Sequence, residues 1–288
     1  MAESACRIET HVAGDGYRWR FRHYVPAASP RGRVVLIHGI QSHGGWYEHS
    51  CNRLRDAGFD VFFLDRRGSG LNSEYRGDAP GFRRLLDDVG EFLRGFQDER
   101  IAAPGQSPIK LFLVGISWGS KLATAVQRRH PGLIDGLVLL CPGFCPKVGP
   151  SLGERLSILA ARLVAPRRLF PIPLNDPELF TATPRWQEFL RADTLSLREA
   201  TARFFVESVR LDGYLRRVPR HVTVPVLLLL AEKDRIIDNA RTRRFVGRFA
   251  TRDKQVIEYE GAHHTLEFEA EPDHFLCDLI SWLDKHVG

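Results

Sequence analysis

Short apolar runs alternate along the chain with segments in which apolar residues recur every three or four positions. The runs "RVVLIHG", "FDVFFLD", "IKLFLVG", "LIDGLVLLCPG", "VPVLLLLAEKD" and "KQVIEYEGAHH" are typical of strands, most of them buried on both faces. Residues 80–99 have helical spacing, with apolar side chains at Phe82, Leu85, Leu86, Val89, Phe92, Leu93 and Phe96. Further helices are expected at 47–57, after Ser117, near 239–249 and from about 272. This alternation predicts an α/β fold: a mainly parallel sheet covered by helices on both faces.

The first residues differ from this pattern. "CRIETHVA" and "YRWRFRHYV" flank the turn signal "GDG", and the second segment alternates polar and apolar residues. Such a pair predicts an antiparallel hairpin before the parallel part of the sheet.

A second interruption spans residues 144–220, where no buried strand is expected. The segment begins with an amphipathic helix, "SLGERLSILAARLVA", and is then broken by prolines at 166, 171, 173, 177 and 184. An insertion of this kind predicts a helical lid over the carboxyl edge of the sheet, where α/β proteins bind ligands. We therefore expect one structural domain, with core residues 1–143, the lid at 144–220 and core residues 221–288.

The first helix of this insertion has a leucine face formed by Leu152, Leu156, Leu159 and Leu163. Simple packing of the lid on the core is the favoured interpretation. Arg155 and Arg162 on the polar side would also suit transient contact with a membrane surface.

Composition narrows the class of protein. Of 288 residues, 43% are hydrophobic and 26% charged, as in ordinary globular proteins. The start of the chain lacks the basic and apolar regions of a secretory signal, and no apolar run approaches the length of about 18 residues that spans a membrane. The five cysteines are scattered, which supports neither a zinc site nor a disulfide framework. A cytoplasmic protein without metal or cofactor is the simplest expectation.

The net charge of +6 raises the question of an anionic partner. The 41 basic residues, 35 of them arginine, are interspersed with acidic ones, and no concentrated basic stripe is present. We therefore expect no nucleic-acid partner. The excess of arginine over lysine points to a GC-rich bacterial source.

Candidate chemistry begins at Ser117 in "LFLVGISWGSK". The serine lies between Gly115 and Gly119, where a strand passes directly into a helix, which is the setting of a nucleophile elbow. A side chain at either glycine would crowd the sharp turn. The helix N-terminus favours developing negative charge at this point. A serine nucleophile also needs a base and a group that orients the base.

Suitable partners follow at the ends of two later strands. Asp234 ends one strand and is the predicted acid, with Asp238 as a competing candidate; His263 and His264 follow Gly261 at the end of the next strand. The order Ser, acid, His predicts a catalytic triad. Two backbone N–H groups, of Ile40 and Trp118, are expected to form the oxyanion hole, and the indole of Trp118 to line the acyl pocket or pack below it.

These motifs resemble the α/β-hydrolase fold, and within it the monoacylglycerol lipases and lysophospholipases. The similar segments are "IHGIQSHGGWYEHSCNRLRDAGFDVFFLDRRGSGLNS" and "YEGAHHTLEFE". The resemblance implies that His264, five residues before Glu269, is the base. It also implies structural roles for a set of loop residues: His38, His43, Asp65, Gly68, Gly70 and Ser73.

The resemblance is incomplete at the elbow. Ile116 and Trp118 stand where the family usually has His and Met, and "G-x-S-W-G-S" is similar to proline iminopeptidases, whose "HGGPG" loop is here "HGIQSHGG". A serine nucleophile argues against haloalkane dehalogenases and epoxide hydrolases. The expected function is hydrolysis of lipid-like carboxylic esters, such as monoacylglycerols or lysophospholipids.

Three other functions remain open at this point. An aminopeptidase would need acidic groups in the lid, for which the candidates are Glu178, Glu188, Glu199 and Glu207. A thioesterase or acyltransferase would use the same triad, and a non-catalytic scaffold would bind a ligand without turnover.

Overall fold

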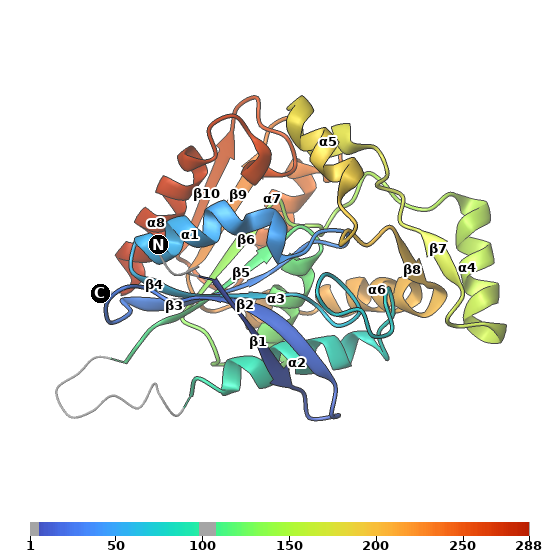
Figure 1. The fold of residues 1–288 in the computed structure, drawn as a ribbon, viewed down its shortest axis with the longest axis horizontal. Coiled ribbons are helices and arrows are strands. Elements are labelled where there is room, and N and C mark those ends of the chain that lie inside the picture. Colours follow the sequence, from blue (N-terminus) through green and yellow to red (C-terminus); the bar gives the residue numbers. More distant parts are fainter. Residues whose placement is uncertain (1–5, 98–107, 288) are drawn as a thin grey trace.

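The computed structural model describes residues 6–97 and 108–287, which form one eight-stranded sheet flanked by helices (Figure 1). The sheet has the order β1-β2-β4-β3-β5-β6-β9-β10. Its strands are β1 (Cys6–Val12), β2 (Arg18–Tyr24), β3 (Gly32–Ile37), β4 (Phe59–Leu64), β5 (Leu111–Ile116), β6 (Gly136–Leu140), β9 (Val226–Ala231) and β10 (Lys254–Tyr259). The six strands from β4 to β10 pair in parallel, and β1 and β2 form the expected antiparallel hairpin at one edge.

The core lies along the centre of this sheet. Every residue of β3, β5, β6 and β9 is buried, because both of their faces are covered. The continuous apolar runs of the sequence thus mark the central strands, and their assignment is confirmed.

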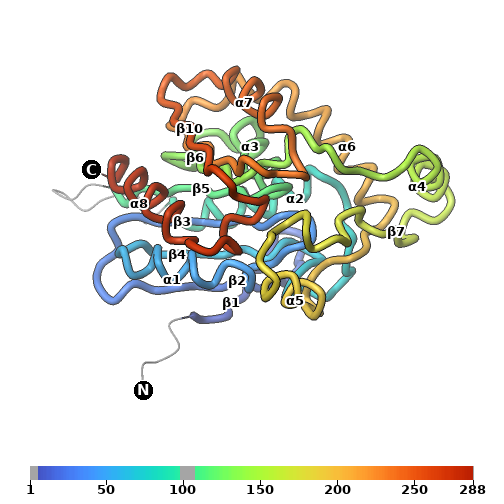
Figure 2. Tube along the Cα trace, turned by 90° about the horizontal axis from the view of Figure 1, so that it is seen from above, coloured from blue at the N-terminus to red at the C-terminus, as the bar shows by residue number. Residues whose placement is uncertain are grey.

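Helices cover both faces, as predicted. α1 (Glu48–Asp56) and α8 (Asp273–Val287) contact each other on one face, whereas α2 (Phe82–Arg94) and α3 (Gly119–Arg129) contact each other on the other (Figure 2). α7 (Asn239–Gly247) connects β9 to β10. α2 ends earlier than expected, and residues 98–99 of the predicted helix lie outside the described residues. Its apolar stripe is buried or packs against the core, as predicted.

The segment between β6 and β9 consists of α4 (Leu152–Val164), β7 (Leu169–Pro171), η3 (Pro177–Leu179), α5 (Pro184–Ala192), β8 (Glu199–Thr201) and α6 (Ala202–Leu215). The expectation of no buried strand here was wrong, because β7 and β8 form a short antiparallel pair that buries Phe170 and Ala200. Strands of three residues have too few apolar positions to show alternation. Short 3-10 turns, η1 (Gly44–Tyr47), η4 (Pro219–His221) and η5 (Leu266–Phe268), complete the described elements.

α4 lies at the tip of the molecule in both views (Figures 1 and 2). It packs on α6 through Ile158 and Ala161, which join a small cluster with Phe170 and Ala202. Other residues of the segment between β6 and β9, such as Leu174, Leu190 and Phe204, join the main core, so the segment packs on the core as expected. The four leucines of α4 take no part in this packing and are exposed by 55% to 85%. A helix that contacts the protein along one narrow line leaves most of its circumference in solvent, whatever its sequence pattern.

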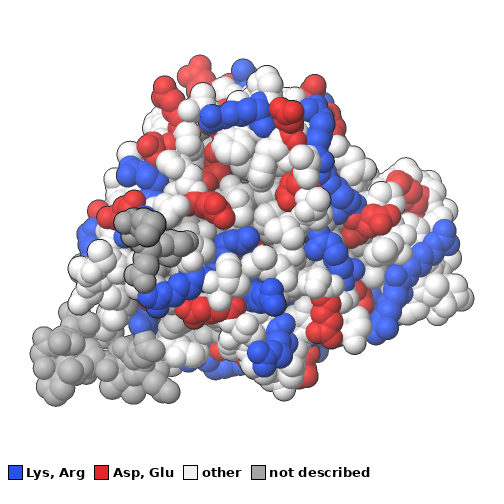
Figure 3. All heavy atoms as spheres, in the orientation of Figure 1, with Lys and Arg blue, Asp and Glu red and all other residues white. Residues whose placement is uncertain are grey.

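The surface charge is mixed. Lys and Arg lie among Asp and Glu over the face shown in Figure 3. Within the described ranges, no helix combines the length and the apolar character needed to cross a bilayer.

Candidate active site

Ser117 occupies the turn between β5 and α3 in a left-handed conformation, with φ of 49°. For an L-residue this conformation costs on the order of 1–3 kcal/mol and persists only where the surroundings hold it. The N–H of Ser117 donates to the carbonyl of Leu140 (2.9 Å), and its own carbonyl accepts from the N–H of Gly143 (2.8 Å). These two bonds fix the strained residue to the end of β6.

The two flanking glycines are required by close packing. A Cβ atom at Gly115 would lie 2.5 Å from Cα of Ser120. One at Gly119 would overlap the carbonyl oxygens of Ile37 and His38 at the end of β3. The crowding expected at both positions is therefore confirmed, and it explains why the turn can be this sharp.

The structure brings Ser117, His264 and Asp234 together in a line. Nε2 of His264 lies 2.9 Å from Oγ of Ser117, and Nδ1 lies 2.6 Å from Oδ2 of Asp234. His264 and Asp234 are buried, whereas Ser117 is partly exposed. This is the geometry of a hydroxyl that can transfer its proton to an imidazole whose other nitrogen is bound by a carboxylate.

The surroundings of Asp234 favour its ionised form. Burial alone raises the pKa of Asp234, but the positive charge and hydrogen bond of His264 and the amides of Ile236 and Ile237 outweigh burial and lower the pKa below its ordinary value. Both amides donate to Oδ1, at 2.7 Å and 2.9 Å. Oδ2 is thus left for His264.

The competing candidates have other roles. Asp238 is the N-cap of α7, where its side chain accepts from the N–H of Arg241 (2.9 Å). The N–H of His263 donates to Glu269 (2.7 Å), and its ring also faces that carboxylate. Neither residue contacts Ser117 in the hydrogen bonds described, so the line runs through Asp234 and His264.

Ile40 and Trp118 border the cavity at Ser117. A Cβ at Gly39 would lie 3.2 Å from Cβ of Ser117, which places the loop after β3 directly against the serine. The Trp118 ring is buried, and its Nε1 donates to Oγ of Ser208 on α6 (2.8 Å). Trp118 therefore borders the cavity, and its indole packs against α6.

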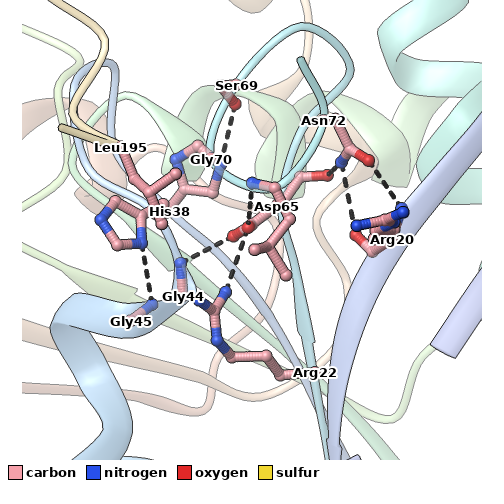
Figure 4. Close-up of polar contacts among 12 residues, drawn as sticks. Arg20, Arg22, His38, Gly44, Gly45, Asp65, Ser69, Gly70, Asn72 and Leu195 are labelled. Carbon is pink, nitrogen blue, oxygen red and sulfur yellow. Dashed lines mark hydrogen bonds and ion pairs between the residues drawn. The ribbon is translucent and has the colours of Figure 1, made fainter. Parts of the chain in front are cut away.

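Asp65 ties together the loops behind the site (Figure 4). It accepts from the N–H groups of Gly44 (2.7 Å) and Leu71 (2.8 Å) and from Arg22 (3.1 Å). Gly70 has a positive φ, and a Cβ there would overlap the carboxylate of Asp65. Asp65 and Gly70 thus shape the loop after β4, while Ser73 is exposed.

A second hydrogen-bond network, centred on Asp193, was not predicted from the sequence. Nδ1 of His43 accepts from the N–H of Gly45, so Nε2 carries the proton that it donates to Asp193 (3.0 Å). Trp46 and Ser196 donate to the same carboxylate oxygen, each at 2.7 Å. Burial alone raises the pKa of Asp193, but these hydrogen bonds lower it below its ordinary value. The network joins the end of α5 to the loop after β3 across a sequence separation of 150 residues, and no local motif signals it.

A cavity of about 620 Å³ opens at Ser117 beneath α4 and α6. Its walls are predominantly apolar, and the side chains that form them come mainly from the segment between β6 and β9: Val148, Ile158, Leu159, Ile172, Leu174, Phe205, Val206 and Val209, with Ile236 and Ile237. The volume and lining suit a flexible hydrocarbon chain.

One group of described side chains has the composition of a metal site. Potential ligand atoms of Cys141, Asp234 and His264 lie within 4.8 Å of one another. Burial raises the pKa of the Cys141 thiol well above its ordinary value, which disfavours the thiolate that binds metals. Asp234 and His264 are hydrogen-bonded to each other, so this group is better explained by the Ser–His–Asp line.

The chain is similar to several known proteins. The sequence model of the family described as serine aminopeptidase, S33, matches residues 28–271. A monoacylglycerol lipase of Mycolicibacterium smegmatis is 30% identical, with 99% of each chain covered. A monoglyceride lipase of Homo sapiens is 28% identical over 90% of this chain and 83% of its own length.

Solved structures show the same fold. A soluble variant of monoglyceride lipase from Saccharomyces cerevisiae, in complex with a substrate analogue, superposes with a TM-score of 0.83 at 21% identity, covering 99% of this chain and 97% of the other. The chain thus has the α/β-hydrolase architecture expected from its motifs.

Proposed function

Because this chain belongs to the serine aminopeptidase S33 family of α/β-hydrolases and is a serine hydrolase similar to monoacylglycerol lipases, we propose that it hydrolyses carboxylic esters of monoacylglycerol or lysophospholipid type through Ser117, His264 and Asp234. The observation that carries the proposal is the continuous hydrogen-bonded line from Ser117 to Asp234 at the floor of an apolar cavity.

The reaction follows from this line. His264 takes the proton of Ser117 while Oγ attacks the ester carbonyl, and Asp234 holds the imidazole tautomer and stabilises its positive charge. The amides of Ile40 and Trp118 stabilise the oxyanion. His264 then gives its proton to the leaving alcohol, and water attacks the acyl-enzyme by the same route in reverse.

The cavity supports a lipid-like substrate. Its apolar walls would bury an acyl chain, each methylene contributing about 0.8 kcal/mol. The relatives named as monoacylglycerol or monoglyceride lipases are consistent with a glyceryl ester, and a phospholipase of Bacillus subtilis, 24% identical over 91% of this chain, with a lysophospholipid.

Aminopeptidase activity is less well supported by the charges of the cavity. An aminopeptidase must hold the ammonium group of its substrate with carboxylates. Among the described residues that line the cavity, the acid is Asp212, which pairs with Lys121 (2.6 Å), and the cations are Lys121, Lys147, Arg155 and Arg210. None of Glu178, Glu188, Glu199 and Glu207 lines it.

We further propose that residues 144–220 act as a lid and that α4 docks on membranes. The exposed leucines of α4 include Leu159, which also borders the cavity, and Arg155 and Arg162 flank them. An apolar helix face with basic neighbours suits an anionic lipid surface. Docking there would bring the opening of the cavity close to its substrate.

The test is a substrate panel with the purified protein and its Ser117→Ala variant. Monoacylglycerols and lysophospholipids should be hydrolysed faster than an aminoacyl arylamide or an acyl thioester. Ser117→Ala should abolish hydrolysis while its circular dichroism spectrum stays unchanged. Faster cleavage of the arylamide would favour the aminopeptidase, and undiminished hydrolysis by the variant would exclude the mechanism.

A further inference from the structure

Arg66, in the loop after β4, is a buried arginine that forms no ion pair with the described residues. Its residue is 4% exposed, and among the described residues no carboxylate lies within ion-pair distance of its guanidinium. Its Nε atom is buried without a hydrogen-bond partner. A buried charge is normally paired, because removing it from water costs several kcal/mol. The position of Arg66 therefore calls for an explanation.

Both hydrogen bonds of the guanidinium go to the loop that borders Ser117. Nη2 donates to the carbonyl of Gly39 (3.0 Å) and to the carbonyl of Ile40 (2.8 Å). The other face of Arg66 meets the elbow, since its Cζ atom lies 4.8 Å from the centre of the Trp118 ring. Arg66 thus contacts the two residues whose amides are the proposed oxyanion donors.

The carbonyl of Gly39 is held a second time by His38. Nε2 of His38 accepts from the N–H of Arg66 (2.9 Å), so Nδ1 carries the proton and donates to the Gly39 carbonyl (2.8 Å). Burial and the charge of Arg66 lower the pKa of His38 well below its ordinary value, which keeps the ring neutral in this arrangement. Side chain and backbone of Arg66 therefore act on the same peptide.

The orientation of that peptide decides where the N–H of Ile40 points. The described peptide bonds are trans, so the N–H of Ile40 is antiparallel to the carbonyl of Gly39. With the carbonyl held by Arg66 and His38, the N–H points away from them. Ile40 and Ser117 line the same cavity.

From these contacts we propose that Arg66 is a positioning residue for the oxyanion hole: it holds the Gly39–Ile40 peptide so that the N–H of Ile40 faces the substrate oxygen, and its charge favours the oxyanion. The proposal rests on the proposed ester hydrolysis at Ser117.

Two physical effects support this role. The peptide follows a glycine, the residue with the least resistance to rotation, and a flipped peptide would present the Gly39 carbonyl where a donor is needed. A cation at the carbonyl end of a peptide also polarises it, which strengthens its N–H as a donor in a site of low dielectric. Burial lowers the pKa of Arg66 to about 9, so the guanidinium remains charged at neutral pH.

The test compares Arg66→Met and Arg66→Lys with Arg67→Met. Arg67 is the matched control, because it is also buried but pairs with Asp88 and Asp15 instead of the loop carbonyls. For each variant, kcat and KM are measured on a soluble p-nitrophenyl ester and expressed per folded molecule. Affinity is measured for an alkyl trifluoromethyl ketone, which forms an oxyanion with serine, and for the corresponding alcohol, which does not.

Arg66→Met should lower kcat by about 10- to 100-fold, with KM little changed. This decrease does not exceed the decrease in kcat expected when a direct oxyanion donor is removed. Affinity for the ketone should fall by a similar factor and affinity for the alcohol should not. Arg66→Lys should be intermediate, and Arg67→Met should keep the kcat of the wild type. If Arg66→Met does not fold, the same comparison is made with Arg66→Lys, which keeps the charge but not the fork of donors.

An unchanged kcat in a folded Arg66 variant, or equal weakening of ketone and alcohol, would overturn the proposal. That failure is distinct from failure of the proposed function. If only the role of Arg66 is wrong, the wild type still hydrolyses the ester and Ser117→Ala does not. If the proposed function is wrong, the wild type itself is inactive or Ser117→Ala retains activity.

Discussion

Nε2 of His264 lies 2.9 Å from Oγ of Ser117, although 147 residues separate them in the sequence. The contact forms because β5 and β10 both end at the carboxyl edge of a parallel sheet, where their following loops meet. Asp234, at the end of β9, reaches His264 from the strand next to β10. The site is thus a product of sheet topology.

Replacing Asp234 by Asn should lower kcat by about 10⁴-fold, because an amide can donate to Nδ1 of His264 and select the wrong tautomer. The measurement is steady-state hydrolysis of a soluble p-nitrophenyl ester. Asp238→Asn is the matched control four residues on. Since Asp238 caps α7, and Asn caps a helix equally well, that variant should keep both activity and stability. If Asp238→Asn lost most of its activity and Asp234→Asn did not, Asp238 would be the acid that orients His264.

Glu267 should make stability depend on pH. Burial raises its pKa to about 7, despite hydrogen bonds from Ser50 that lower it. Because the folded pKa exceeds the unfolded value of about 4.3, the folded state binds the proton more tightly. This contribution is fully present below about pH 4.3 and is lost as the pH rises through about 7, amounting to about 4 kcal/mol at most.

Urea unfolding of wild type and Glu267→Gln at about pH 5 and about pH 8 checks this contribution. The free energy of unfolding should fall more between the two pH values in the wild type than in the variant. Glu271→Gln, at an exposed position nearby, should behave as the wild type. Parallel pH profiles for wild type and Glu267→Gln would show that Glu267 is not the titrating group.

The exposed face of α4 should govern activity on membranes. Replacing Leu156 and Leu163 together by Ser removes apolar surface that is more than half exposed, and should weaken binding to anionic vesicles by about 10-fold or more. Hydrolysis of vesicle-borne monoacylglycerol should fall with binding, while hydrolysis of a short soluble ester stays constant. Ile8→Ser, at a position on β1 that is also more than half exposed, serves as control. Unchanged vesicle binding would reject the docking proposal.

The wall of the cavity should set the preferred acyl length. Val206 lines it, so Val206→Trp should lower kcat/KM for a dodecanoyl ester by about 10-fold or more relative to a butanoyl ester. Val25→Trp, on the surface before β3, should leave the ratio unchanged. If both esters lost activity equally in Val206→Trp, the acyl chain would not occupy this cavity.

Structure could be predicted best from the sequence at positions where a single physical requirement determines the residue type. Buried parallel strands have to be apolar on both faces, so the central strands were found from apolar runs alone. Gly115 and Gly119 indicate the sharp turn at Ser117, because a Cβ atom fits at neither position. The choice of His264 over His263 needed the family resemblance, since adjacent histidines differ only in the direction in which the folded loop points them.

Other features depend on tertiary contacts that leave no local signal. The leucine pattern of α4 is the same whether the face packs or is exposed, and only the position of the helix at the tip decides. Arg66 and Arg67 are chemically identical neighbours, yet one contacts the loop beside Ser117 and the other an aspartate pair. Asp193 reaches His43 from a distant helix end. Such roles follow from the packing of separate segments.

The most direct test of the account is the site of covalent reaction with a fluorophosphonate, which traps an activated serine. Tryptic residues 111–121, "LFLVGISWGSK", should carry one adduct per molecule, and fragmentation should place it on Ser117 rather than Ser120. Ser117→Ala should not be labelled. An adduct on any other residue, or full labelling of Ser117→Ala, would contradict the assignment of Ser117 as the nucleophile.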